Sequence, residues 1–279
     1  MSPARRAFER AAATYDSADA LHREIGRRLV EHLDPIRVDP SRVLDLGCGT
    51  GSQLEALARR FPRAEIVGID FSRSMLRRAA GRAPWWKRAV GVRTPRFACA
   101  NVEELPLAAA SAGLAFSNLA LQWCDAKAVF AEAARVLEKD GLLLFSTLGP
   151  DTLRELRAAF GAAPFPGLAD MHDLGDALVA AGFGQPVMEM ELLTLEYSTL
   201  EALLEDLHAV GALAAAPARS RGLASRRQRA AAAQAYEARR RDGALPATYE
   251  VVYGHAWKAA ARRAADGRQV IDFVRTPRP

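Results

Sequence analysis

A short apolar run that leads directly into three closely spaced glycines limits the folds open to this chain more than any other feature. Residues 43–51 read Val-Leu-Asp-Leu-Gly-Cys-Gly-Thr-Gly, and a helical pattern starts near Ser52. Glycine tolerates positive φ and lets a ligand approach the backbone, and the free N–H groups of the following helix point toward the same place. This order of strand, glycine turn and helix predicts a ligand site at a strand end of an α/β fold.

Strand-like and helix-like segments alternate through the first half of the chain. We expect strands at 42–46, 65–69, 97–100, 113–117 and 141–147, and helices at 11–33, 52–60, 72–80 and 126–137. Because these strands are short and continuously apolar, they predict a mainly parallel sheet with helices on both faces. Two longer strands, expected at 187–197 and 249–258, complete a seven-stranded sheet.

The chain divides into four expected parts. Residues 1–40 are expected to form a helical segment over the site, and residues 41–197 form the core. Residues 198–245 are mostly helical and are expected to form a lid between the last two strands, over the carboxyl edge of the sheet. Residues 246–279 supply the last core strand and a tail.

The formal net charge of +5 originates in the expected lid. Residues 219–241 contain eight arginines and one acid, Glu237, which leaves the rest of the chain at −2. The arginines are Arg219, Arg221, Arg226, Arg227, Arg229, Arg239, Arg240 and Arg241. Such a surface would steer an acidic partner, whereas a solvated helical face without a partner is the alternative. Nucleic-acid binding is not expected, because Tyr236 is the one aromatic residue in the cluster.

The cysteines and the apolar segments indicate a cytoplasmic protein. Cys48, Cys99 and Cys124 have no metal-ligand spacing, so we expect no metal site and a reducing compartment. The charged N-terminus lacks the apolar stretch of a secretory signal. The longest uncharged run, 105–124, is interrupted by Pro, Ser, Gly, Asn and Gln, so we expect no membrane contact.

Polar side chains lie at the ends of the first three expected strands. Asp45 precedes the first glycine by two residues, and a carboxylate there favours an ammonium group over a pyrophosphate. Asp70 ends the second strand, where an acid can accept hydrogen bonds from both ribose hydroxyls, or simply cap the next helix. Asn101 follows the third strand and can accept a hydrogen bond from a base, or start an Asx turn.

These features together resemble the class I S-adenosylmethionine (SAM)-dependent methyltransferases. The resemblance implies a Rossmann-like fold and SAM as the cofactor, with an Asn at 101 where the family usually has Asp. The cofactor-binding residues that it implies are Asp45, Gly47, Gly49, Gly51, Asp70, Phe71, Met75, Asn101, Val102 and Asn118.

Later segments are more specific. Residues 11–16, 145–156, 170–176 and 245–258 resemble the malonyl-[acyl-carrier protein] O-methyltransferase (BioC) family of biotin biosynthesis. The resemblance implies methyl transfer to the free carboxylate of a malonyl group on acyl-carrier protein, an acidic partner that would dock on the basic lid. An ionised carboxylate needs no general base, so positioning and exclusion of water should dominate. The candidates for holding the malonyl group are Tyr15, Gln122, Trp123 and Arg154.

Two other interpretations fit the same motifs. The chain could be a class I methyltransferase that acts on another small molecule, such as a quinone precursor. It could also be a non-catalytic assembly factor that keeps the SAM-binding fold.

Overall fold

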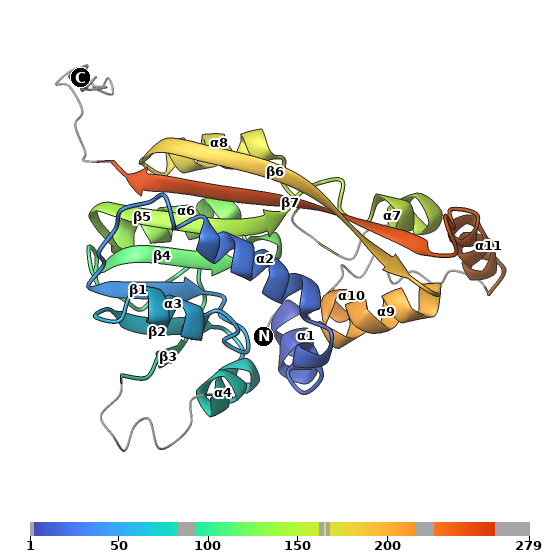
Figure 1. The fold of residues 1–279 in the computed structure, drawn as a ribbon, viewed down its shortest axis with the longest axis horizontal. Helices are drawn as coiled ribbons and strands as arrows, with labels where there is room; N and C mark the ends of the chain where they lie inside the picture. The colour runs from blue at the N-terminus through green and yellow to red at the C-terminus, as the bar shows by residue number, and fades with distance from the viewer. Residues whose placement is uncertain (1–2, 83–92, 162–164, 166–167, 216–225, 260–279) are drawn as a thin grey trace.

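A seven-stranded sheet forms the centre of the computed structural model, which describes residues 3–82, 93–161, 165, 168–215 and 226–259. The strand order is β3-β2-β1-β4-β5-β7-β6 (Figure 1). The strands are β1 (Arg42–Leu46), β2 (Glu65–Asp70), β3 (Arg96–Cys99), β4 (Ala112–Asn118), β5 (Leu137–Leu148), β6 (Phe183–Tyr197) and β7 (Leu245–Lys258).

The first five strands run parallel, and β7 pairs antiparallel with both β5 and β6. The expected mainly parallel, seven-stranded α/β fold is therefore confirmed. In the parallel part, the carboxyl ends of β1, β2 and β4 meet at one edge. The glycine turn after β1 and Asp70 at the end of β2 are thereby brought to the same place.

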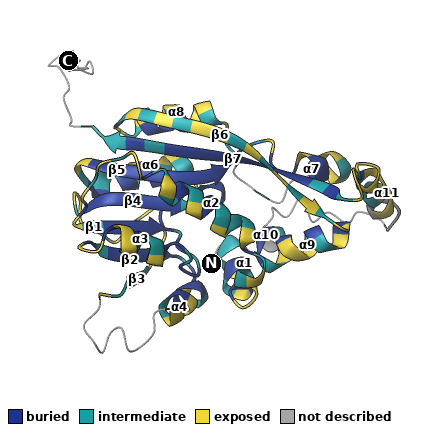
Figure 2. Cartoon of the chain, viewed as in Figure 1, coloured by how far each residue is buried: buried dark blue, intermediate teal, exposed yellow. Residues whose placement is uncertain are grey.

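Helices cover both faces of the sheet, and two large clusters of buried apolar side chains form the core. Figure 2 shows that the central strands are mostly buried. The helical segments are α1 (Pro3–Ala11), η1 (Tyr15–Ser17), α2 (Ala20–Glu31), α3 (Leu54–Arg60), α4 (Arg73–Arg82), η2 (Leu121–Trp123), α6 (Ala126–Val136), α7 (Arg154–Phe160), α8 (Met171–Ala180), α9 (Leu200–Ala209), α10 (Ala212–Ala215) and α11 (Arg226–Glu237). Within the described residues, no helix is long and apolar enough to cross a membrane.

The prediction of a single leading helix at 11–33 is wrong. The chain forms α1, then the short 3-10 turn η1, and then α2. The break has a tertiary cause, because the Asp16 carboxylate in η1 accepts a hydrogen bond from the Thr50 hydroxyl at 2.6 Å and pairs with Arg82 at 2.9 Å. These contacts hold η1 against the glycine turn, and a continuous helix would carry Asp16 past it.

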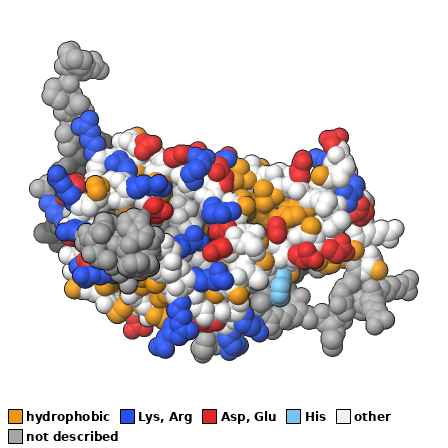
Figure 3. Space-filling view, turned by 60° about the horizontal axis from the view of Figure 1, so that its bottom comes forward, with side chains coloured by type: hydrophobic (Ala, Val, Ile, Leu, Met, Phe, Trp, Pro, Cys, Tyr) orange, Lys and Arg blue, Asp and Glu red, His pale blue; other side chains and the backbone are white. Residues whose placement is uncertain are grey.

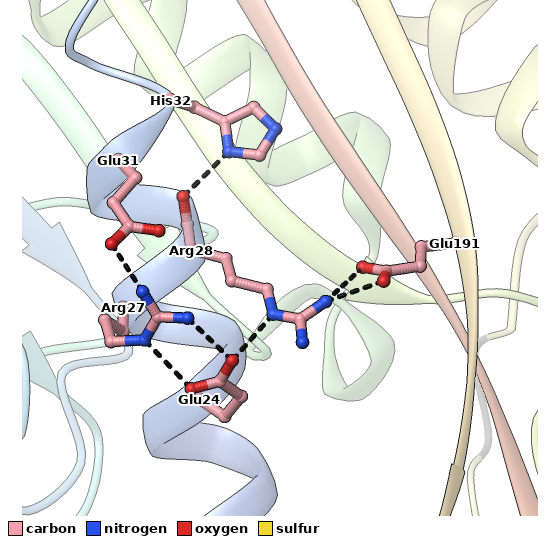
Figure 4. A network of polar contacts seen from close by, with 6 residues as sticks. All are labelled: Glu24, Arg27, Arg28, Glu31, His32 and Glu191. Carbon is pink, nitrogen blue, oxygen red and sulfur yellow. Dashed lines mark hydrogen bonds and ion pairs between the residues drawn. The ribbon is translucent and has the colours of Figure 1, made fainter.

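Ion pairs hold α2 across the sheet (Figure 4). Arg28 donates to both carboxylate oxygens of Glu191 on β6, at 2.6 and 2.8 Å, and also to Glu24 on its own helix. Arg27 donates to Glu24 and Glu31. Because Arg28 and Glu191 are only about one-third exposed, this pair fixes the position of α2 better than a fully exposed pair would.

The insertion between β6 and β7 is helical, as expected, but its helices go to different places. The short helix α10 packs against α1, whereas α11 packs against α7 at the far end of the β6–β7 ribbon (Figure 1). Tyr236 anchors α11, since its ring is fully buried and its hydroxyl donates to the Pro246 carbonyl at 2.8 Å. Arg219 and Arg221 lie outside the described residues.

Candidate functional site

The turn after β1 has the backbone geometry that its glycines predict. Gly47, Gly49 and Gly51 have φ values of +77°, +53° and +80°, a region that side chains with a Cβ rarely adopt. A Cβ on Gly47 would lie 2.4 Å from the Ala120 Cβ, and one on Gly51 would lie 2.9 Å from Leu54. A Cβ on Gly49 would meet nothing within 4 Å. Gly47 and Gly51 therefore serve packing, and Gly49 leaves open space for a ligand.

Asp70 joins this turn to the next strand. Its carboxylate accepts hydrogen bonds from the Gly49 N–H at 3.0 Å and the Ser72 N–H at 2.7 Å. Burial raises the pKa of Asp70 to about 6, although the two backbone donors oppose the shift. Asp70 therefore orders the turn before α4, whereas the helix cap is Ser72, whose hydroxyl accepts from the Met75 N–H at 3.2 Å; Asp70 also faces the cavity described next.

A cavity of about 500 Å³ opens beside Asp70 at the carboxyl edge of the sheet. Ten of the predicted site residues line it: Tyr15, Gly47, Gly49, Asp70, Phe71, Met75, Asn101, Val102, Asn118 and Trp123. They come from the N-terminal segment and from the ends of four strands, so the fold brings together residues that lie more than 100 positions apart.

Asn101 lines this cavity, as base binding requires, and it also forms the Asx turn that the sequence offered as the alternative role. Its side-chain oxygen accepts a hydrogen bond from the Glu103 N–H at 3.2 Å, and its amide donates to the Glu103 carboxylate at 3.2 Å. A carbonyl oxygen has two lone pairs, so Asn101 can still accept one more hydrogen bond from a ligand.

Asp45 is buried and does not line the cavity. Burial raises the pKa of Asp45 to about 8, and the nearby charge of Asp70 adds to the shift. Two adjacent carboxyl groups with raised pKa values are costly to ionise, and a cation bound beside them would relieve that cost.

Aromatic side chains close one side of the cavity. The Phe8 ring on α1 meets Trp123 edge-on at 5.3 Å and Phe71 at 5.8 Å. Tyr15 lies 6.5 Å from Phe8, and burial together with nearby aspartates raises its pKa. This wall makes one side of the cavity apolar.

The sequence placed residues 1–40 over the site but singled out only Tyr15 from them, although Ala4, Arg5 and Phe8 also line the cavity. The available signal was the buried spacing of Ala7, Phe8 and Ala11, which is typical of an amphipathic helix. Glu9 fastens α1 in place, because its carboxylate accepts hydrogen bonds from the first N–H groups of α4, at Arg73 and Ser74.

Two predicted acceptor-binding residues are not brought to the cavity. Gln122 is fully buried, and its amide donates to the Leu119 carbonyl at 2.7 Å and accepts from the Thr147 hydroxyl at 3.3 Å. Arg154 lies on α7, half-exposed, with its guanidinium 3.5 Å from Glu155. Gln122 therefore holds the turn that carries Trp123, whereas Arg154 belongs to an ion-pair cluster on α7.

No group of three or more His, Cys, Asp or Glu side chains is placed to hold a metal ion in the parts of the chain that the structure describes. Cys48, Cys99 and Cys124 are free thiols.

Comparisons with known proteins agree with this geometry. Residues 44–145 match a family model described as a methyltransferase domain. The malonyl-[acyl-carrier protein] O-methyltransferase of Gallionella capsiferriformans is 48% identical over 272 residues, 96% of this chain and 94% of the relative. That of Laribacter hongkongensis is 49% identical over 282 residues, 98% of this chain and 95% of the relative.

Solved structures share the fold at low identity. The YcgJ protein from Bacillus subtilis matches with a TM-score of 0.59 and 17% identity, over 85% of this chain and 99% of its own. A geranyl diphosphate methyltransferase in complex with SAM matches with a TM-score of 0.51 and 18% identity, over 85% of each chain.

Proposed function

This chain belongs to the malonyl-[acyl-carrier protein] O-methyltransferase family, and from that premise we propose its reaction. It transfers a methyl group from SAM to the free carboxylate of malonyl-[acyl-carrier protein], giving a methyl ester that enters biotin synthesis. The observation that carries this proposal is the 48–49% identity to two malonyl-[acyl-carrier protein] O-methyltransferases. This identity extends over nearly the whole chain, including the cavity residues and the insertion between β6 and β7.

The residues around the cavity of about 500 Å³ beside Asp70 suit SAM. The open space at Gly49 and the carboxylate of Asp70 fit the ribose, and Asn101 with Val102 fits the adenine. Asp45 does not line the cavity, so it would attract the ammonium of the amino-acid part through water or through its charge, because a buried carboxylate gains most from a nearby cation. SAM supplies a sulfonium methyl group, which a carboxylate oxygen can take as the methyl–sulfur bond breaks.

The chain itself has to position the acceptor and exclude water. A malonyl carboxylate is already ionised at pH 7, so no proton has to be removed from it. Tyr15 and Trp123 line the cavity and are the predicted acceptor-side residues that the geometry supports. Gln122 acts indirectly, through its hydrogen bond to Leu119. Exclusion of water by the aromatic wall leaves the carboxylate poorly hydrated and more reactive.

The reaction is tested with malonyl-[acyl-carrier protein] and methyl-labelled SAM. We expect a labelled methyl ester from the malonyl carrier and none from acetyl carrier, which lacks the free carboxylate. Rescue of a biotin auxotroph that lacks this step tests the same activity in cells. SAM binding without any methyl ester would refute the reaction and favour a different acceptor or a non-catalytic role.

We further propose that the carrier docks on the arginines of the insertion. Carrier proteins of this kind are acidic. Arg239 and Arg241 are exposed just after the end of α11, and Arg240 between them pairs with Glu237. Arg226, Arg227 and Arg229 begin the same helix. A cytoplasmic location is part of this proposal, since the carrier and the substrate are expected there.

A second basic surface makes this docking test sharper. Lys and Arg side chains also appear on the face seen in Figure 3. Separately, α4 carries the exposed arginines Arg73, Arg77 and Arg78. Changing Arg226, Arg227 and Arg229 to Glu should weaken turnover of the carrier-bound substrate and spare a small malonyl thioester. The matched control changes Arg73 and Arg77 to Glu and keeps Arg78, which donates to the Ala13 carbonyl and pairs with Asp16. A selective loss in the control alone would move the docking surface to α4.

A further inference from the structure

A second, smaller cavity adjoins the larger one. It has a volume of about 60 Å³ and shares the side chains of Phe8, Leu119 and Trp123 with the larger cavity. Its other walls come from the start of α2, the end of β5, the facing ends of β6 and β7, and the helices α9 and α10. The two cavities therefore share part of the aromatic wall.

The walls of the smaller cavity are mainly apolar, and its polar side chains include His22 on α2. The Nδ1 atom of His22 is buried and has no hydrogen-bond partner among the described residues. Its ring lies 5.5 Å from that of Tyr15, which lines the larger cavity. Burial lowers the pKa of His22 to about 4, so the ring is neutral at pH 7.

The other titratable groups that face this cavity already have partners. The Tyr197 hydroxyl is hydrogen-bonded to both Asp206 and Tyr249, which leaves Asp206 engaged at the exposed end of the cavity. The position of α2 is also fixed near His22, because the Asn118 amide donates to the His22 carbonyl at 3.0 Å. His22 is therefore held in place while its ring still has hydrogen-bonding capacity.

We propose that the smaller cavity receives the carboxylate end of the acceptor, and that His22 donates the hydrogen bond that positions this carboxylate beside the larger cavity. This assignment rests on the proposed function and deepens it. It rests on the shared wall, the unpartnered ring nitrogen, and the contact between the rings of His22 and Tyr15.

A neutral donor suits this reaction better than a cation would. An arginine paired with the carboxylate would stabilise its negative charge and reduce its reactivity, whereas a neutral imidazole N–H orients the group and leaves the charge in place. Phe8, Leu119 and Trp123 limit hydration of the same carboxylate.

The size of the cavity also selects the acceptor. A volume of about 60 Å³ has room for a carboxylate-sized group, because one water occupies roughly 30 Å³ of liquid and a cavity of about 150 Å³ is known to hold benzene. A ring such as that of a quinone precursor would need the walls to repack.

Binding measurements on two variants test the assignment without relying on turnover. His22→Phe keeps an aromatic ring against Tyr15 but removes the donor, and His22→Gln keeps a neutral donor. Calorimetry would compare malonyl-pantetheine with acetyl-pantetheine, using protein saturated with S-adenosylhomocysteine. We expect His22→Phe to weaken binding of malonyl-pantetheine about tenfold or more and to leave binding of acetyl-pantetheine unchanged. His22→Gln should bind malonyl-pantetheine almost as tightly as the wild type does.

The controls separate the possible failures. Unchanged affinity for S-adenosylhomocysteine shows that each variant keeps its fold. If His22→Phe binds the malonyl compound as tightly as the wild type does, or loses both thioesters equally, the role of His22 is refuted. If the wild type itself does not distinguish the two thioesters and makes no methyl ester, the proposed function fails instead.

Discussion

Replacement of Asp45 by Asn should make the free protein more stable while it weakens cofactor binding. Asp45 is 3% exposed, and burial raises its pKa from 3.8 to about 8. At pH 7 the folded protein therefore holds this carboxyl group mainly protonated, whereas the unfolded chain holds it ionised. This difference in protonation lowers the free energy of unfolding of the wild type. The Asp45→Asn variant has no such loss, because Asn does not ionise.

The size of the effect follows from the pKa shift. One pKa unit corresponds to about 1.4 kcal/mol, and pH 7 lies about three units above the unfolded value, so the wild type loses about 4 kcal/mol. The Asn amide, left without partners, costs about 1–3 kcal/mol in return. Asp45→Asn should therefore raise the free energy of unfolding by about 1–3 kcal/mol at pH 7.

The dependence on pH gives the decisive assay. Because the folded-state pKa of Asp45 is raised, the loss in the wild type grows as pH rises from about 4 to about 8. Urea unfolding at pH 5 and pH 7 should show the advantage of Asp45→Asn shrinking by about 2–3 kcal/mol at the lower pH. The exposed Asp39→Asn variant is the control and should show no such change. An advantage that is the same at both pH values would refute the reasoning.

Three further results are expected. Asp70→Ala should lower the affinity for S-adenosylhomocysteine at least tenfold by calorimetry, since Asp70 organises Gly49 and faces the cavity; unchanged affinity would remove the ribose assignment. Phe8→Ala should cost about 3 kcal/mol in urea unfolding, because its ring is 8% exposed; an unaltered midpoint would contradict its packing role. SAM should bind more tightly as pH rises from 6 to 8, because Asp45 and Asp70 both ionise over this range, and the slope should be smaller in Asp45→Asn, where Asp70 still titrates; an equal slope in both proteins would contradict this role of Asp45.

The sheet and the glycine turn were predictable because local patterns determine them. Residues 43–51 combine a buried strand, glycines at positive φ and a helix start, and each of these is encoded within a few positions. Asp70 could be placed for the same reason, since strand ends of a parallel sheet meet at one edge.

The N-terminal half of the site was less predictable, because distant contacts decide it. The break at Tyr15 depends on Asp16 meeting Thr50, and the position of α1 depends on Glu9 meeting the start of α4. Neither contact leaves a periodic signal. Gln122 was wrongly predicted to hold the acceptor because it precedes Trp123 in the sequence. Its amide is instead hydrogen-bonded to the Leu119 carbonyl and the Thr147 hydroxyl, and such internal contacts cannot be read from the sequence.

The distribution of charge between the two cavities suggests how the site handles both substrates. Asp70 lines the larger cavity and is electrostatically coupled to the buried Asp45, so this side of the cavity favours a cation over a free carboxylate. The smaller cavity has mainly apolar walls and a neutral His22, and Asp206, which also lines it, is hydrogen-bonded to Tyr197. An acceptor carboxylate there gains its main attraction from the positive charge of bound SAM. It follows that the cofactor should bind first, because it supplies the charge that favours the acceptor.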